Sequence, residues 1–129
     1  RFEIYTEIYI EKVKVEVLTG LRMAKTMLLP ATMRYQTELA DNALSLKDVG
    51  IEADTSTLES VSGLVKALQS SIADLGAKVE KEDDSHGKYS CDVLLPALLA
   101  VRDAADALEL VTADDEWPLP SYQEMLFIK

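Results

Sequence analysis

The sequence has little of the chemistry on which metal and nucleophilic sites depend. Cys91 is the only cysteine and His86 the only histidine among 129 residues. An intramolecular disulfide and a paired Glu-x-x-His di-iron site are therefore excluded, and a zinc site is disfavoured. A lone cysteine fits a reducing cytoplasm, and neither a GxxxxGK[ST] loop nor a GxGxxG turn is present to cradle phosphates. We expect no catalytic, cofactor-binding or metal-binding residue here.

Long apolar runs and excess positive charge are also missing. No stretch approaches the roughly 18 apolar residues of a membrane span. The first residues also lack the basic segment followed by an apolar segment that a secretory signal peptide shows. The formal net charge is −10, which disfavours nucleic acid and anionic membranes as partners. We interpret the acidic runs as solvated loops and helix ends. They are Glu80, Glu82, Asp83 and Asp84, and Asp114, Asp115 and Glu116.

Two long amphipathic helices are predicted in the second half of the chain, because apolar residues recur there at alternating spacings of three and four. The first apolar seam is Leu58, Val61, Val65, Leu68, Ile72, Leu75 and Val79, and the second is Cys91, Leu94, Leu98, Val101, Ala105 and Leu108. Ser56 and Glu59 form a capping-box pattern at the start of the first helix. Pro96 predicts either a kink in the second helix, from about 89 to 111, or a start nearer to the proline. Residues 82–88 read as a loop.

The first fifty residues give two conflicting signals. Residues 12–17 alternate with period two, as in a half-buried strand. A longer window favours one helix up to about Leu29, through the seam Tyr5, Tyr9, Val13, Val17, Leu21, Ala24 and Leu28. A further helix is expected from about Ala31 to Val49, with Gly50 placed to end it and Pro30 either in its first turn or at a kink. Its candidate core residues are Met33, Leu39, Ala40, Ala43 and Leu46.

The C-terminal tail differs from the rest of the chain. Trp117-Pro118-Leu119-Pro120 is expected to be extended, because each proline restricts itself and the residue before it. Ser121 and Glu124 form a second capping-box pattern. The predicted fold is a single all-α domain over residues 1–129, an antiparallel bundle of about four helices with this tail docked on it. Because the chain begins at Arg1 without methionine, we expect it to be part of a longer protein.

Four blocks carry a resemblance to a known family. The segment from Trp117 to Phe127 is similar to the closing W-P-x-P-x-Y-x-x-(hydrophobic)-L-F pattern of type III glutamine synthetases. Residues 101–109 resemble the family's (L/V)-R-x-x-x-D-x-L-E helix, and residues 7–16 and 30–36 resemble its E-x-Y-I-x-x-V-x-I-E and P-A-x-x-x-Y-Q segments. The motif positions, for which we expect structural roles, are Tyr9, Pro30, Tyr35, Arg102, Asp106, Trp117, Pro118, Pro120, Tyr122 and Phe127.

The resemblance implies a non-catalytic helical domain downstream of the catalytic domain of an enzyme that joins ammonia to glutamate. ATP and magnesium or manganese would then belong to the parent enzyme. The implied partners are the chain's own catalytic domain and neighbouring subunits of a homo-oligomeric ring, in the cytoplasm. The alternative is a free-standing helical adaptor, or a histidine-phosphotransfer-like module that would use His86. The loop setting of His86 argues against phosphotransfer.

Overall fold

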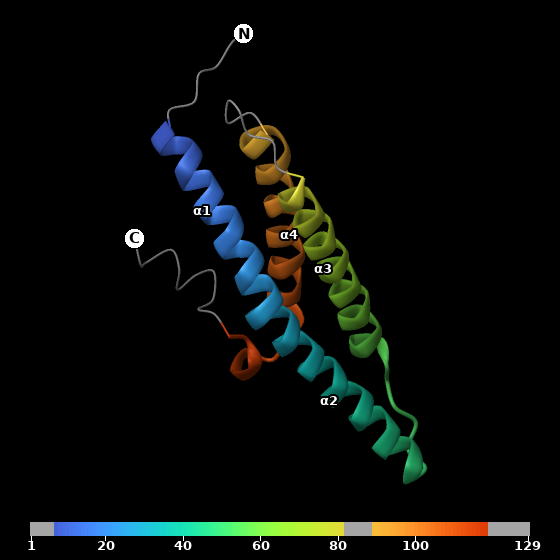
Figure 1. Cartoon of the computed structure of the whole chain (residues 1–129). Helices are drawn as coiled ribbons and strands as arrows, with labels where there is room; N and C mark the ends of the chain where they lie inside the picture. Colours follow the sequence, from blue (N-terminus) through green and yellow to red (C-terminus); the bar gives the residue numbers. More distant parts are fainter. Residues whose placement is uncertain (1–6, 82–88, 119–129) are drawn as a thin grey trace.

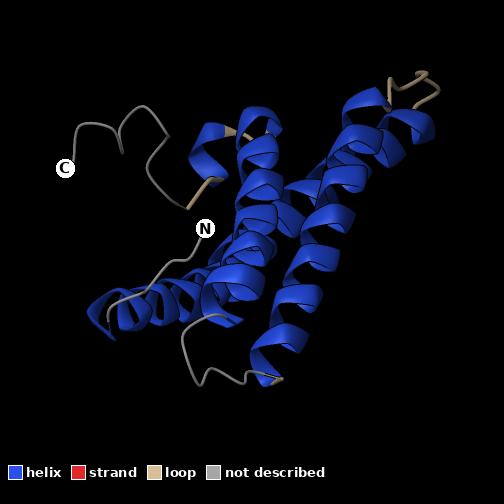
Figure 2. Ribbon diagram, turned by 90° about the horizontal axis from the view of Figure 1, so that it is seen from above, coloured by secondary structure: helices blue, strands red, loops and turns tan. Residues whose placement is uncertain are grey.

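A computed structural model describes residues 7–81 and 89–118, and within those ranges every regular element is helical (Figure 2). The helical segments form three rods (Figure 1). The first rod is α1 (Glu7–Met23), the π-helical segment η1 (Ala24–Leu28) and α2 (Leu29–Asp48). The second is α3 (Ser56–Glu80), and the third is the π-helical segment η2 (Ser90–Leu94) followed by α4 (Leu95–Val111). A short 3₁₀ turn, η3 (Asp114–Glu116), follows α4.

The rods pack side by side (Figure 1). α3 runs antiparallel to the other two rods, whereas α1 and α4 run in the same direction. α1 and α4 approach closely at Gly20, where an added Cβ would lie 2.6 Å from Leu98 Cδ1. The last part of α2 extends beyond the other rods. None of the described helices combines the length and hydropathy that a membrane-spanning segment needs.

Both predicted seams of the second half form the core. In α3 the buried residues are Val61, Val65, Leu68, Ile72 and Leu75, and in α4 they include Leu98, Val101, Ala105 and Leu108. Val13, Val17, Ala24 and Leu28 of the first rod join the same cluster. The three rods therefore share one hydrophobic core. Most of the seam positions that the spacing indicated are buried in it, whereas Leu58 and Val79 are half-buried.

The prediction of about four helices is not confirmed, because the chain continues through Pro30 as a single rod. Pro30 lies in the first turn of α2, which is one of the two positions expected for it. In an α-helix the ring of Pro30 would clash with the carbonyl of Thr26. The preceding turn is π-helical instead, with the Leu29 N–H bonded to the Ala24 carbonyl. Pro96 follows η2 in the same way, so both prolines stand second in a helix that continues a π-helical turn. The wider turn absorbs each proline without ending the rod.

Residues 12–17 lie within α1, so the longer helical window prevailed over the strand-like alternation. Three of the expected core positions in the first rod are wrong, and two of them, Tyr9 and Met33, are each 42% exposed. Ala40 is exposed as well, whereas Ala31 and Thr32 are buried. For Met33 and Ala40, which follow it, the π-helical turn contributes to this difference because it holds one extra residue, which rotates the faces of α2 relative to those of α1.

Two side chains donate hydrogen bonds to a neighbouring rod and so fix the position of the rods along one another. Gln36 Nε2 of α2 donates to Ser62 Oγ of α3 over 2.8 Å. The Tyr89 hydroxyl, just before η2, donates to the Lys78 carbonyl over 2.6 Å. The second bond satisfies one of the carbonyls that the end of α3 leaves without a helical partner. It therefore joins α3 to the start of the third rod.

The end of α2 and the start of α3 at Ser56 are confirmed, whereas the capping box predicted for α3 is not observed. Gly50 has φ +84°, and the Gly50 and Ile51 N–H groups donate to the Lys47 and Leu46 carbonyls, which is a Schellman motif. At α3, however, the N-cap residue is Thr55 and its side chain makes no capping bond, so the capping box expected from Ser56 is absent. Asp54 Oδ1 accepts from the Ser56 N–H over 3.0 Å instead.

Candidate functional site

The described part of the chain offers little for metal chemistry. In residues 7–81 and 89–118, no group of three or more His, Cys, Asp or Glu side chains could hold a metal ion. His86 and the side chain of Cys91 lie outside the described residues. The alternative of histidine phosphotransfer is therefore not tested by the described residues.

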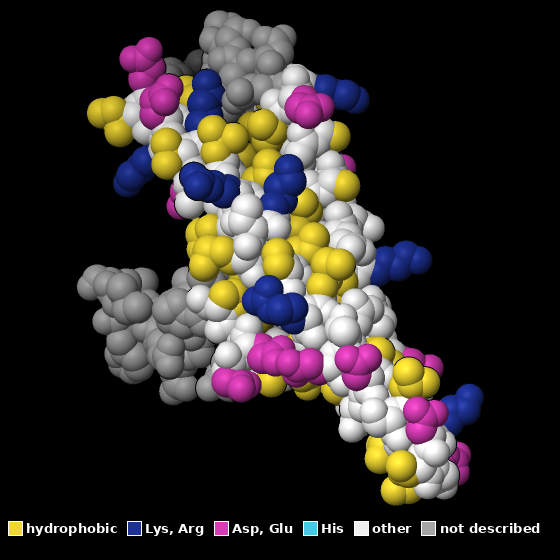
Figure 3. All heavy atoms as spheres, turned by 60° about the horizontal axis from the view of Figure 1, so that its bottom comes forward, with side chains coloured by type: hydrophobic (Ala, Val, Ile, Leu, Met, Phe, Trp, Pro, Cys, Tyr) yellow, Lys and Arg dark blue, Asp and Glu magenta, His cyan; other side chains and the backbone are white. Residues whose placement is uncertain are grey.

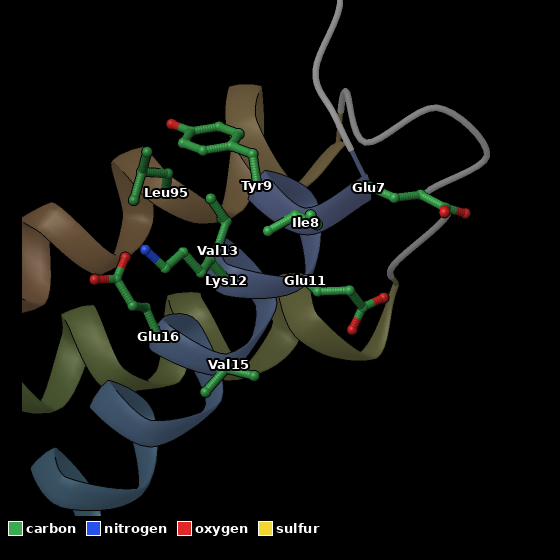
Figure 4. A pocket seen from close by; sticks show the side chains of 9 residues that line it. All are labelled: Glu7, Ile8, Tyr9, Glu11, Lys12, Val13, Val15, Glu16 and Leu95. Atoms are coloured by element: carbon green, nitrogen blue, oxygen red, sulfur yellow. The ribbon is translucent and has the colours of Figure 1, made fainter.

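An open groove of about 940 Å³ runs along the start of α1. Figure 4 shows Tyr9 and Lys12 extending toward the side of Leu95, whereas Glu7, Glu11 and Val15 extend in other directions. Eight of its nine lining residues are nearly consecutive in one helix, so the groove is the flank of a helix end. Small-molecule sites enclose most of their ligand and are lined from several elements. This groove has neither property.

The motif residues within the described part of the chain do not gather into one site. Tyr9 is exposed at the start of α1, and Pro30 and Tyr35 are half-buried in α2, with Tyr35 packed against the core. Arg102 and Asp106 are exposed one turn apart on α4. These positions belong to different rods, and the structural roles expected for them stay predictions.

The tail is described only at its start. Trp117 is half-buried and packs against the hydrophobic core, and Pro118 is exposed. Pro120, Tyr122, Phe127 and the second capping-box pattern at Ser121 and Glu124 lie outside the described residues. Docking of the tail therefore stays a prediction.

A pair of carboxyl groups joins η3 to α2, which the sequence did not indicate. Glu116, interpreted above as part of a solvated acidic run, is half-buried, and its Oε2 is screened from solvent. Its pKa is raised, first by a hydrogen bond to the Glu38 carboxyl, then by desolvation and by the charges of Glu38 and Asp115. Arg34 opposes this shift. A proton shared between Glu116 and Glu38 explains how two acidic groups can meet there.

The projecting end of α2 carries the second open groove, of about 500 Å³. It is lined mainly by alanine and aliphatic side chains from α2 and from the connection to α3. Figure 3 shows hydrophobic side chains gathered on this projection, at the lower right. The apolar residues most exposed there are Leu44, Val49 and Ile51. The sequence did not single out these residues.

Comparisons with known proteins give a consistent result. Residues 1–47 match the sequence profile of the family described as glutamine synthetase C-terminal domain. The whole chain is 28% identical, over 142 residues, to a glutamine synthetase of Bacteroides fragilis (strain YCH46), of which it covers 20%. It is also 28% identical, over 147 residues, to the type-3 glutamine synthetase of Dictyostelium discoideum, of which it covers 19%. No solved structure matches the chain significantly.

The chain thus spans about a fifth of the length of the curated relatives that it matches. The profile match covers α1, η1 and nearly all of α2. The two full-length relatives extend the similarity through α3 and α4 to the tail. These matches confirm the resemblance found in the four sequence blocks and identify the chain as a relative of the glutamine synthetase C-terminal domain, with a type-3 enzyme among its relatives.

Proposed function

We propose that this chain is a non-catalytic structural domain of a cytoplasmic type III glutamine synthetase, and that it supports the assembly of the enzyme's subunits. The observation that carries the proposal is the similarity of the whole chain to about a fifth of two glutamine synthetases. Ligation of ammonia to glutamate, with ATP and magnesium or manganese, then belongs to the remainder of the parent. The partners are that remainder and neighbouring subunits of a ring.

The packing supports a structural role. The three rods share a core of their own, so the domain does not depend on another domain for its main hydrophobic contacts. At the same time it leaves large apolar side chains exposed, among them Ile8, Val15 and Leu18 on α1. Exposed apolar surface of this kind is typical of interfaces with other protein surfaces.

Deletion in the parent tests the proposal. The reading frame upstream of Arg1 should encode a glutamine synthetase catalytic domain, and the full-length protein and a form that lacks residues 1–129 are then compared. We expect the shortened form to assemble less completely, as measured by light scattering. The isolated chain should form no glutamine and release no saturable heat with ATP and magnesium in calorimetry. Unchanged assembly of the shortened protein, or ATP binding by the isolated chain, would contradict the proposal.

A further inference from the structure

The projecting end of α2 has an apolar surface that no other rod covers. We call this the apolar tip, and it consists of Leu44, Val49 and Ile51, which are 61%, 71% and 54% exposed. The groove beside it is lined by Ala40, Ala43 and Ala53, among others. Leaving three large aliphatic side chains in water forgoes the stabilisation that burial would give. Their grouping on one projection indicates an interaction surface.

The apolar tip is built on an ordered turn. The Schellman motif holds Val49 and Ile51 on either side of Gly50. The Asp54 carboxylate accepts the Ser56 N–H, which holds the end of the connection against α3, and this bond lowers the pKa of Asp54. A surface that is already ordered loses less conformational entropy on binding. The apolar tip is therefore suited to insertion into another surface as a preformed unit.

The charges around the apolar tip decide against a second copy as its occupant. Exposed acidic residues surround it, namely Asp41, Asp48, Glu52 and Asp54, with Lys47 as the basic residue among them. Two such tips would place four carboxylates against four, which is unfavourable. The whole chain is also acidic, with a net charge of −10. The complementary partner is an apolar depression with basic residues at its rim.

The part of the homologous polypeptides that this chain does not cover indicates where the complementary apolar depression lies. The chain covers 20% and 19% of two glutamine synthetases, so about four-fifths of a homologous polypeptide has no counterpart in this structure. We propose that the apolar tip inserts into a basic-rimmed apolar depression on that remaining part of the parent polypeptide. This inference rests on the proposed function and names the surface through which the domain would act. Interface anchors are commonly a few apolar side chains surrounded by a polar rim.

Hydrogen exchange in the full-length parent and in the isolated chain tests this inference. Amides of residues 44–53 should exchange at least about tenfold more slowly in the parent, because docking suppresses local opening. Leu44→Glu and Ile51→Glu should each restore the faster exchange of the isolated chain. Leu110→Glu is the matched control, since Leu110 is 87% exposed on α4 and the same charge is added there. Thermal unfolding of each isolated variant checks that the fold is retained.

The possible outcomes separate the inference from the proposed function. Equal exchange of residues 44–53 in the parent and the isolated chain would overturn the inference. A mass of the isolated chain that rises with concentration, and no longer rises in Leu44→Glu, would assign the apolar tip to a second copy and also overturn it. Deletion of the domain could impair assembly while Leu44→Glu and Ile51→Glu, introduced into the full-length parent, leave hydrogen exchange as slow as in the unsubstituted parent. In that case only the inference fails. If the deletion leaves assembly intact, the proposed function fails.

Discussion

Two buried threonine hydroxyls differ in whether they have a hydrogen-bond partner. Thr32 is fully buried in α2 and its Oγ1 donates to the Leu29 carbonyl over 3.0 Å. Thr112, at the end of α4, is also buried, but its Oγ1 has no partner in the described structure. A buried hydroxyl without a partner costs free energy, whereas a bonded one contributes modestly to stability.

Substitution by valine should therefore have opposite effects at these positions. Thr112→Val should stabilise the fold by about 1 kcal/mol, because it removes an unpaired polar atom and keeps the Thr112 N–H bond to the Leu108 carbonyl. Thr32→Val should cost about 1 kcal/mol, because a hydrogen bond is lost. Urea unfolding of the two variants measures both changes. Destabilisation of similar size in both would show that the Thr112 hydroxyl has a partner, such as a bound water.

The capping of α3 shows where single-residue patterns fail. Ser56 and Glu59 satisfy the capping-box spacing, yet Ser56 is already the first residue of the helix. The side chain that accepts the free N–H is Asp54, two residues before it. Which polar residue caps a helix depends on the path of the preceding chain, here the connection from Gly50. That path follows from the packing of α2 on α3, which the local sequence does not encode.

At the scale of elements, the sequence predicted the helices better than their junctions. The seams in α3 and α4 were correct because a spacing of three and four residues gives one apolar face whatever that face packs against. Pro30 and Pro96 could be assigned only to a kink or a helix start, because a proline is compatible with several local geometries. The π-helical turns keep each rod continuous. Residues before and after the turn at Pro30 can therefore both pack into the core. That outcome depends on contacts between distant elements.

Gly50 and Gly63 provide a matched test of helix ends and helix interiors. A Cβ at either position would meet no atom within 4 Å, so packing does not differ between them. Gly50→Ala should destabilise the fold by about 1 kcal/mol, because φ +84° is unfavourable for alanine. Gly63→Ala should stabilise it by up to about 1 kcal/mol, because Gly63 lies within α3 and alanine has the higher helix propensity. Thermal unfolding gives both values, and a neutral Gly50→Ala would show that the turn is not fixed.

At the scale of the whole molecule, the sequence predicted an all-helical domain and misjudged how its parts combine. The first rod is one continuous helix in place of two, so α2 projects beyond the bundle and does not fold back against α1. The candidate interaction surface followed from that projection, and the spacing of Leu44, Val49 and Ile51 alone did not indicate it. The contact of Glu38 with Glu116 was equally hidden, because it joins residues far apart in the chain.

That contact should make the attachment of η3 to α2 depend on pH. The pKa of Glu116 in the folded chain is raised above its ordinary value of 4.5. The folded state therefore holds a proton that the unfolded state releases more easily. The stabilisation is fully present below the unfolded pKa, and it is lost as the pH rises through the higher folded pKa. Arg34 limits the loss because its positive charge favours the ionised form of Glu116.

Trp117, the only tryptophan, adjoins Glu116 and reports on this attachment directly. As the pH rises from about 4 to 8, its emission should shift to longer wavelength and the urea midpoint should fall. Glu116→Gln should abolish this pH-dependent component, because the amide is neutral throughout the range and can still donate to Glu38. Asp103→Asn, on the exposed face of α4, is the charge-matched control and should retain it. If Glu116→Gln and the wild type give parallel pH profiles, the carboxyl pair does not govern the attachment, and Trp117 is held by its packing against the core alone.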